Sequence, residues 1–202
     1  MNNYVRELQK NLGIHDDGLF GPKTLEAALA AIAKPNGVSP LIEPRLLPSS
    51  LFPKINRVVK ELTWHCTATP EHREISAATI RSWHVDGRGW SDIGYHYIVH
   101  LDGSIEAGRP LNRIGAHVAG HNRYTIGAVY VGGMDSKMIN PKDTRTAAQK
   151  AAMLALTEEL CRRYDLNVIS GHNQYAAKSC PSFSVITDKL GNINGFKKGE
   201  RI

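Results

Sequence analysis

Residues 171–183 read GHNQYAAKSCPSF and place a histidine, His172, eight residues before a cysteine, Cys180. Imidazole nitrogen and thiolate sulfur are common zinc donors in proteins, and a short loop can bring both onto one ion. Pro181 restricts the backbone directly after Cys180 and favours an extended conformation there. A catalytic zinc site needs a third protein donor and one position open to water. The best candidate for that donor is His65, in the segment LTWHCT, and the three residues together favour a zinc hydrolase.

The length, charge and cysteine content of the chain limit the classes of protein it can belong to. Its 202 residues suffice for one domain with a substantial core and a small further module. The net charge of +6 and the pI near 9.3 favour an anionic partner, and nucleic acid, an acidic membrane and the bacterial cell wall all fit. The N-terminus, MNNYVRELQK, lacks the apolar run of a secretory signal, and no segment has the roughly 20 apolar residues of a spanning helix. Cys66, Cys161 and Cys180 form a poor disulfide framework, so we expect synthesis in a reducing cytoplasm.

The first 34 residues predict two short helices joined by a tight turn. Apolar residues recur at helical spacing on both sides of the turn signal Asp16-Asp17-Gly18, and Pro22 suits the first turn of the second helix. The segment LQKNLGIHDDGLFGPKTLEAAL resembles the core of the peptidoglycan-binding repeat found beside many cell-wall hydrolases, although that repeat usually has a third helix. A helical hairpin packed on the main domain is the alternative. We therefore expect a peptidoglycan-binding-like module at 1–34.

A proline-rich stretch separates this module from the rest of the chain. Residues 35–53 hold five of the ten prolines, a spacing that disfavours helix and sheet and makes a semi-rigid spacer. We expect a linker at 35–56, a catalytic domain at 57–190 and a solvated basic tail at 191–202.

The catalytic domain has the pattern of an α/β fold. The first predicted strand holds Val58, Val59, Leu62 and Trp64 and ends at His65. The other predicted strands are Tyr95–Leu101, Ser104–Ala107 after a hairpin turn at Asp102-Gly103, Thr125–Val131 and Asn167–Ser170. The predicted helices are one that runs from an N-cap at Ser76 through Trp83 and a long one that begins at a capping box of Thr146 and Gln149. Strands mixed with helices, including a hairpin, predict a mixed central sheet flanked by helices.

The predicted ends of the strands bring the candidate zinc donors together. His65 ends one strand and His172 follows another, and loops at strand ends present groups to a cleft while the sheet holds them in place. Taken singly, a histidine is more often structural and a cysteine more often part of a core. His65 and His172 occur together with Cys180, and Lys178 lies in the same loop as the cysteine. For this combination, a metal site is about as well supported as a structural role.

A series of short motifs recurs between about residues 57 and 184. In order, they are Trp64–Thr69, Trp83-His84, Gly89–Tyr97, Asp102-Gly103, Glu106–Arg109, Gly115–His117, Asn122, Ile126-Gly127, Gly132-Gly133, His172 and Lys178–Phe183. In these motifs and their order the chain is similar to the zinc-dependent N-acetylmuramoyl-L-alanine amidases, the family of amidase-type phage lysozymes and animal peptidoglycan recognition proteins. The ending Lys-x-Cys-Pro-Ser-Phe is typical of the phage members.

The resemblance implies a zinc ion held by His65, His172 and Cys180, and catalytic roles for Tyr95 and Lys178. A zinc-bound hydroxide that attacks an amide would place negative charge on the carbonyl oxygen, where an ammonium and a phenol could stabilise it. The predicted substrate-binding residues are His117, Asn122 and Arg109, although a plain loop role for His117 and Asn122 is nearly as well supported.

Three further residues receive structural predictions. Strand alternation points His96 away from Tyr95, and Cys66 away from His65, so both are expected to be structural. Glu106 is expected to be a surface carboxylate and not a general base.

The resemblance implies hydrolysis of the amide between the lactyl group of N-acetylmuramic acid and L-alanine of the stem peptide. Bacterial peptidoglycan is the expected partner, for a monomer that neither binds nucleic acid nor inserts into a membrane. A phage endolysin that reaches the cell wall through a separate pore protein fits the missing signal peptide. A non-catalytic peptidoglycan receptor is one alternative, although such members typically lack the cysteine ligand. A regulator that binds an intracellular protein, such as a polymerase, is another.

Overall fold

The computed structural model describes residues 9–10 and 47–192. The chain divides into two units, Met1–Pro40 and Leu41–Ile202, and the account below concerns the second. Nearly all of the predicted module at 1–34, the linker up to residue 46 and the tail from residue 193 lie outside the described residues.

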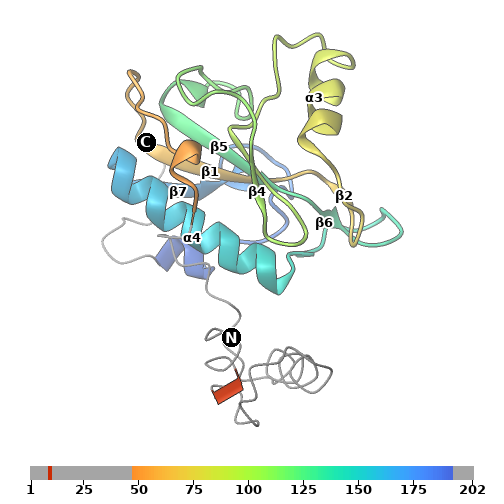
Figure 1. Cartoon of the computed structure of the whole chain (residues 1–202). Coiled ribbons are helices and arrows are strands. Elements are labelled where there is room, and N and C mark those ends of the chain that lie inside the picture. Colours follow the sequence, from red (N-terminus) through yellow and green to blue (C-terminus); the bar gives the residue numbers. More distant parts are fainter. Residues whose placement is uncertain (1–8, 11–46, 193–202) are drawn as a thin grey trace. The chain divides into compact units, whose positions relative to one another are not determined.

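The second unit is built on a five-stranded sheet in the order β4-β3-β5-β1-β7 (Figure 1). The strands are β1 (Glu61–Cys66), β3 (Tyr97–Val99), β4 (Ile105–Ala107), β5 (Thr125–Tyr130) and β7 (Val168–Gly171). Strands β3, β5, β1 and β7 are mutually parallel, and β4 joins the edge antiparallel to β3. A separate parallel pair joins β2 (Thr69–Pro70) to β6 (Gly133–Met134). The predicted α/β fold with a mixed central sheet is therefore confirmed.

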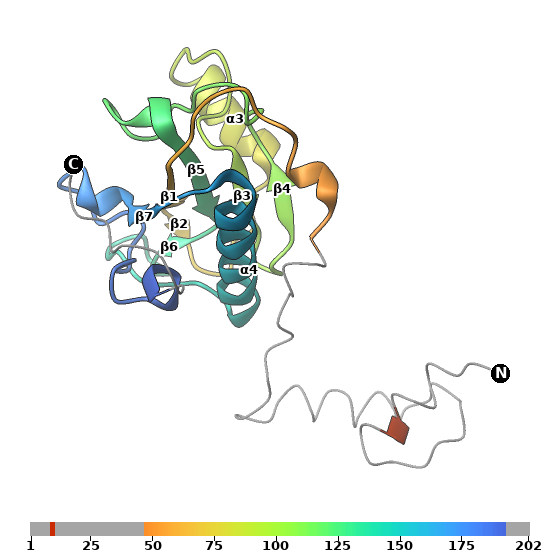
Figure 2. The ribbon, with the colours of Figure 1, turned by 90° about the vertical axis from the view of Figure 1, so that its left-hand side faces the viewer.

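Two α-helices lie on opposite sides of the sheet, α4 (Ala147–Tyr164) on one and α3 (Ala77–Val85) on the other (Figures 1 and 2). Both begin as the sequence predicts. The Ser76 hydroxyl accepts a hydrogen bond from the Thr79 amide, and Thr146 and Gln149 form a complete capping box. The short 3-10 turns are η2 (Ser49–Leu51), η3 (Asn122–Tyr124), η4 (His172–Gln174) and η5 (Lys189–Asn192). Within the described residues, no helix has the length and apolar character needed to cross a bilayer.

The two faces of the sheet differ in chemistry because successive strand residues point to opposite sides. On one face, Leu62, Trp64 and Cys66 of β1 pack with apolar residues of α4 in the main core. On the other face, one half of the sheet is apolar and packs against α3 through Ile98 and Val129. The other half carries polar or very small residues: Thr63 and His65 of β1, Thr125 and Gly127 of β5, and Ser170 of β7. The candidate site lies on this polar half.

Several predicted boundaries differ from the structure. The first strand was expected to include Val58, but Val58 is 61% exposed and β1 begins at Glu61. The strand continues one residue past His65, to Cys66, because its pairing with β5 extends to Tyr130. Strand β3 is shorter than the predicted Tyr95–Leu101, although the amide of His96 still donates to the carbonyl of Gly127 in β5.

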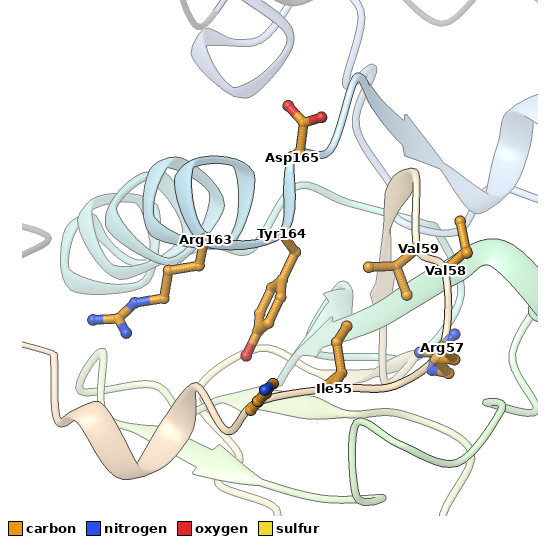
Figure 3. A pocket seen from close by; sticks show the side chains of 8 residues that line it. Ile55, Arg57, Val58, Val59, Arg163, Tyr164 and Asp165 are labelled. Atoms are coloured by element: carbon orange, nitrogen blue, oxygen red, sulfur yellow. The ribbon is translucent and has the colours of Figure 1, made fainter.

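The described part of the predicted linker, residues 47–56, packs on the domain. Phe52 is buried in the main core, and the Tyr164 hydroxyl of α4 donates to the carbonyl of Pro53. A pocket of about 450 Å³ lies where this segment meets the end of α4 (Figure 3). Its lining residues are Lys54, Ile55, Arg57, Val58, Val59, Arg163, Tyr164 and Asp165. None of the predicted site residues lines it, so we assign it no functional role and regard it as a gap between the packed segment and α4.

Candidate metal centre and active site

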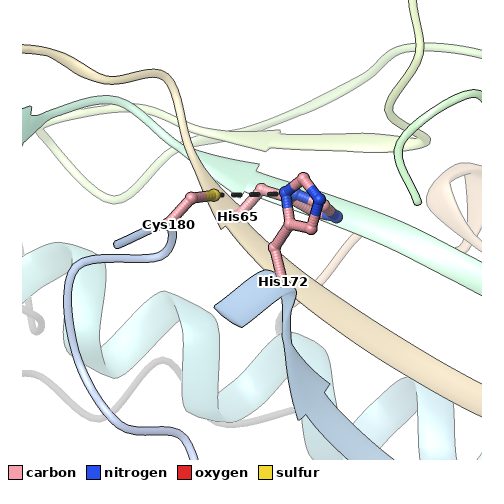
Figure 4. A group of neighbouring side chains, drawn as sticks. All are labelled: His65, His172 and Cys180. Carbon is pink, nitrogen blue, oxygen red and sulfur yellow. Dashed lines mark hydrogen bonds between the residues drawn. The ribbon is translucent and has the colours of Figure 1, made fainter. Parts of the chain in front are cut away.

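His65, His172 and Cys180 converge at the edge of the sheet where β1 and β7 end (Figure 4). The two strands are parallel, and Trp64 pairs with Gly171, so the residues that follow lie side by side on the polar face. The ring centroids of His65 and His172 are 4.7 Å apart. Cys180 reaches the same point from the loop after η4, with its Sγ 3.7 Å from His65 Nδ1. One ligand atom from each residue lies within 4.8 Å of the others.

This donor set fits a metal ion of borderline softness. Two imidazoles and one thiolate are a combination that proteins use for zinc, and three protein donors leave a fourth position open. His65 is fully buried, whereas His172 and Cys180 are half-buried, so the cluster is partly exposed to solvent through these two residues. Among the described residues, no other group of three or more histidine, cysteine or acidic side chains has this geometry.

The cysteine loop is fixed by hydrogen bonds to the ends of strands β5 and β6. The buried Tyr130 hydroxyl donates to the carbonyl of Pro181 at 2.8 Å, and the Ser182 hydroxyl donates to the carbonyl of Gly133 at 2.8 Å. The amide of Cys66 lies 3.3 Å from Cys180 Sγ and donates to it. The sulfur is therefore held directly by the Cys66 amide and indirectly by the two bonds at the residues that follow it.

A buried cation closes the far end of this loop. The Arg145 guanidinium lies 3.3 Å from the ring centroid of Phe183, and it forms ion pairs with Asp143 and Asp188, each at 2.8 Å. The arginine thus joins the loop that carries Cys180 to the segment before α4.

The local electrostatics leave both imidazoles neutral. Burial lowers the pKa of His65 well below its usual value, and His117, His172 and Lys178 lower it further. The pKa of His172 is also lowered, first by burial and then by Lys178. Each ring therefore retains a lone pair for a metal at neutral pH. The hydrogen bond with Cys66 and burial raise the pKa of the Cys180 thiol, so metal binding must displace a proton there.

Tyr95 and Lys178 lie beside the cluster. The Tyr95 ring centroid is 5.1 Å from that of His65, and burial raises the pKa of Tyr95, so its phenol stays protonated. Lys178 is exposed on the cysteine loop, near enough to lower the pKa of His172. Among the described residues, neither the Tyr95 hydroxyl nor the Lys178 ammonium has a hydrogen-bond partner, so both donors are available to a bound molecule.

The three predicted substrate-binding residues are used inside the protein. Buried Arg109 donates to the carbonyl oxygens of Ile93, Asp92 and Ile114. The Asn122 side chain accepts hydrogen bonds from the amides of His117 and Val118. His117 is 8% exposed, and its Nδ1 lies 3.0 Å from Nε2 of His65. These contacts support loop-holding roles for Arg109 and Asn122, and direct contact of the three with substrate stays a prediction.

The structural predictions for the remaining candidates agree with their surroundings. Buried His96 accepts a hydrogen bond from the Gly127 amide at one ring nitrogen, and its other nitrogen lies 3.0 Å from the carbonyl of Arg113. Cys66 is buried on the α4 face, as alternation predicts. Its free thiol also forms a hydrogen bond with the free thiol of Cys180. Glu106 is exposed and lies 3.1 Å from His100.

Fold and site together define a metal-binding enzyme of the α/β class. A family model described as N-acetylmuramoyl-L-alanine amidase matches residues 55–183, and the chain belongs to this family.

Several relatives support the assignment. The chain is 41% identical over 121 residues to the endolysin of Klebsiella phage KP32, a match that covers 60% of this chain and 79% of the relative. It is 38% identical over 122 residues to the endolysin of Escherichia phage T7, with the same coverage. Among solved structures, the N-acetylmuramoyl-L-alanine amidase LysC from Clostridium intestinale URNW is similar, with 25% identity and a TM-score of 0.59 over 72% of this chain and 99% of that chain.

The hydrogen bond that anchors the cysteine loop can be tested by Tyr130→Phe. The change should lower the free energy of unfolding by about 1–3 kcal/mol, because it leaves the carbonyl of Pro181 unsatisfied in a buried place. Denaturant unfolding of the metal-free protein measures it. Tyr164→Phe is the control, since that hydroxyl bonds the carbonyl of Pro53 at the surface. An equal loss in both variants would contradict a special role for the buried bond.

Proposed function

We propose that this chain is an endolysin that hydrolyses the amide between the lactyl group of N-acetylmuramic acid and L-alanine of the stem peptide in bacterial peptidoglycan. The observation that carries the proposal is the cluster of His65, His172 and Cys180 inside a domain that matches the amidase family over residues 55–183. The name endolysin is taken from the phage relatives.

The proposed ligands of the ion are His65, His172 and Cys180, and the proposed ion is zinc. Zinc bound there would lower the pKa of a water molecule and so supply a nucleophile at neutral pH. The protein's own contribution is to present two neutral imidazoles and a fixed thiol at one edge of the sheet. This donor set also argues against a non-catalytic receptor, which would not need the cysteine.

Tyr95 and Lys178 are proposed to act on the carbonyl oxygen of the scissile amide. A protonated phenol and an ammonium, both without a partner in the described structure, are donors that can stabilise negative charge as it develops on that oxygen. Such donors act on the transition state more than on the ground state, so they raise turnover more than affinity.

The proposed roles of the N-terminal residues, of the proline-rich stretch and of the net charge rest on the sequence. We propose that residues 1–34 form a module that holds the enzyme near the wall, and that the proline-rich stretch sets its reach. The net charge of +6 would favour approach to the anionic wall. A monomer suffices for this role.

Digestion of purified peptidoglycan tests the reaction. The protein should release new free amines of L-alanine and no new reducing sugar ends, because the proposed bond joins the sugar's lactyl group to the peptide. Reducing ends without L-alanine amines would identify a glycosidase and refute the proposal.

Metal content tests the ligand set. The purified protein should hold about one zinc per chain, and Cys180→Ser should lose most of it because a neutral hydroxyl is a poor replacement for thiolate. Cys161→Ser is the matched control, since that thiol lies in the core on α4. Full zinc content in Cys180→Ser would remove Cys180 from the ligand set.

The roles of Tyr95 and Lys178 can be separated from metal binding. Tyr95→Phe and Lys178→Ala should keep their zinc, and each should lose turnover by about 10²–10³, the usual cost of one donor to a developing oxyanion. Tyr124→Phe, at an exposed tyrosine, is the control. Zinc content and rate are measured on the same preparations. A variant with parental turnover would show that its residue takes no part, and a parallel loss of zinc would show a structural role.

A further inference from the structure

His65 uses its two ring nitrogens in different directions. Nδ1 lies 3.7 Å from Cys180 Sγ and faces the other candidate ligands, whereas Nε2 lies 3.0 Å from Nδ1 of His117. Both rings are buried, so neither nitrogen can turn to bulk water. If the proposed function is right, Nδ1 must carry the lone pair that binds the metal, and the proton of a neutral ring must sit on Nε2.

The contacts of His117 continue away from the cluster. Its Nε2 lies 3.2 Å from the Thr125 hydroxyl, and that hydroxyl donates to the carbonyl of His121 at 3.1 Å. A backbone carbonyl can only accept, so the single hydrogen of the hydroxyl is committed to His121. The Thr125 oxygen must then accept from Nε2 of His117.

This end point sets the direction of every bond in the chain of contacts. A neutral His117 that donates from Nε2 has a bare Nδ1, so it accepts from Nε2–H of His65. His65 is then protonated on Nε2 and bare on Nδ1, the nitrogen that faces Cys180. The opposite direction would leave the Thr125 oxygen 3.1 Å from a carbonyl oxygen with no hydrogen between them.

The surrounding structure is shaped to hold the His117 ring in this place. A Cβ at Gly127 of β5 or at Gly115 would clash with ring atoms of His117, so a larger residue at either position would displace the ring. Asn122 fixes the backbone on the other side by accepting from the amides of His117 and Val118. Thr125 and Gly127 stand on the same face of the sheet as His65.

We propose that His117 and Thr125 are positioning residues that hold His65 in the tautomer protonated on Nε2, so that its Nδ1 is ready to bind the metal. The hydrogen bonds run from His65 through His117 and Thr125 to the carbonyl of His121. This inference rests on the proposed metal site and adds to it a cause for the orientation and protonation of one ligand. Removal of such outer partners typically weakens metal binding by about 10- to 100-fold.

The tautomer can be measured directly in the full-length protein after zinc is removed. Nitrogen-15 NMR of the histidine rings should show His65 protonated on Nε2 and His117 protonated on Nε2. A proton on Nδ1 of His65 would overturn the proposal, and this measurement needs no variant and no substrate.

Two matched pairs of variants test the same chain of bonds through zinc affinity, measured by competition with a chelator. His117→Leu removes the acceptor for His65, whereas His117→Asn keeps an acceptor oxygen near the position of Nδ1. Thr125→Val removes the hydroxyl, whereas Thr125→Ser keeps it. Zinc binding should weaken by about 10- to 100-fold in His117→Leu. It should weaken to a smaller extent in Thr125→Val and in His117→Asn, which also lacks the contact with Thr125, while Thr125→Ser stays close to the parent.

The outcomes separate this inference from the metal site itself. Equal affinity in His117→Leu and His117→Asn, with a large loss in His65→Ala, would overturn the positioning role and leave the site intact. Parental affinity in His65→Ala would refute the metal site. If the variants at 117 do not fold, the NMR result on the parent protein decides.

Discussion

The alternation of side chains along β1 is the constraint on which the rest of the structure depends. In this strand, Leu62, Trp64 and Cys66 enter the core under α4, and Thr63 and His65 face the other way. The apolar residues fix the register of the strand between β5 and β7, because a slip by one position would expose a tryptophan and bury the polar set against α4. The free energy of burial on one face therefore determines where a metal-binding imidazole stands on the other.

The metal cluster draws on three separate parts of the chain, and each has its own support. His65 is held by the strand and by His117, and His172 is placed by the pairing of β7 with β1. Cys180 depends on a loop that is tied down by Tyr130. The energy that orders the ligands is thus supplied before a metal arrives, so less of the binding energy is needed to order them.

The sequence predicted those parts of the site that follow from local rules. The hydrophobic pattern placed His65 and His172 at the ends of two strands, and the short loop limited where Cys180 could reach. The parallel pairing that brings these two strand ends to one edge is a finding of the structure. The helix starts at Ser76 and Thr146 followed from capping residues, which act within four positions of the chain.

Long-range loop paths could not be predicted in this way. The contact between His65 and His117 spans 52 positions, and the loop that carries His117 is held by Arg109 at the carbonyl of Ile114 and by Asn122 at the amide of His117. Such backbone groups carry no sequence signal. The role of Thr125 could not be predicted either, because threonine is common in strands and its sequence context does not show which side chain it contacts. The prediction that Val58 belongs to the first strand was wrong. An apolar, β-branched residue favours a strand in any sequence context, and only the tertiary structure shows that Val58 is exposed.

X-ray absorption at the zinc edge of the loaded protein tests the central claim most directly. The account predicts one sulfur at about 2.3 Å and two imidazole nitrogens at about 2.0 Å, with one further light atom completing four-coordination. This ligand set would place His65, His172 and Cys180 around a single ion with one position open to solvent. A spectrum without sulfur, or with four protein donors and no open position, would contradict it.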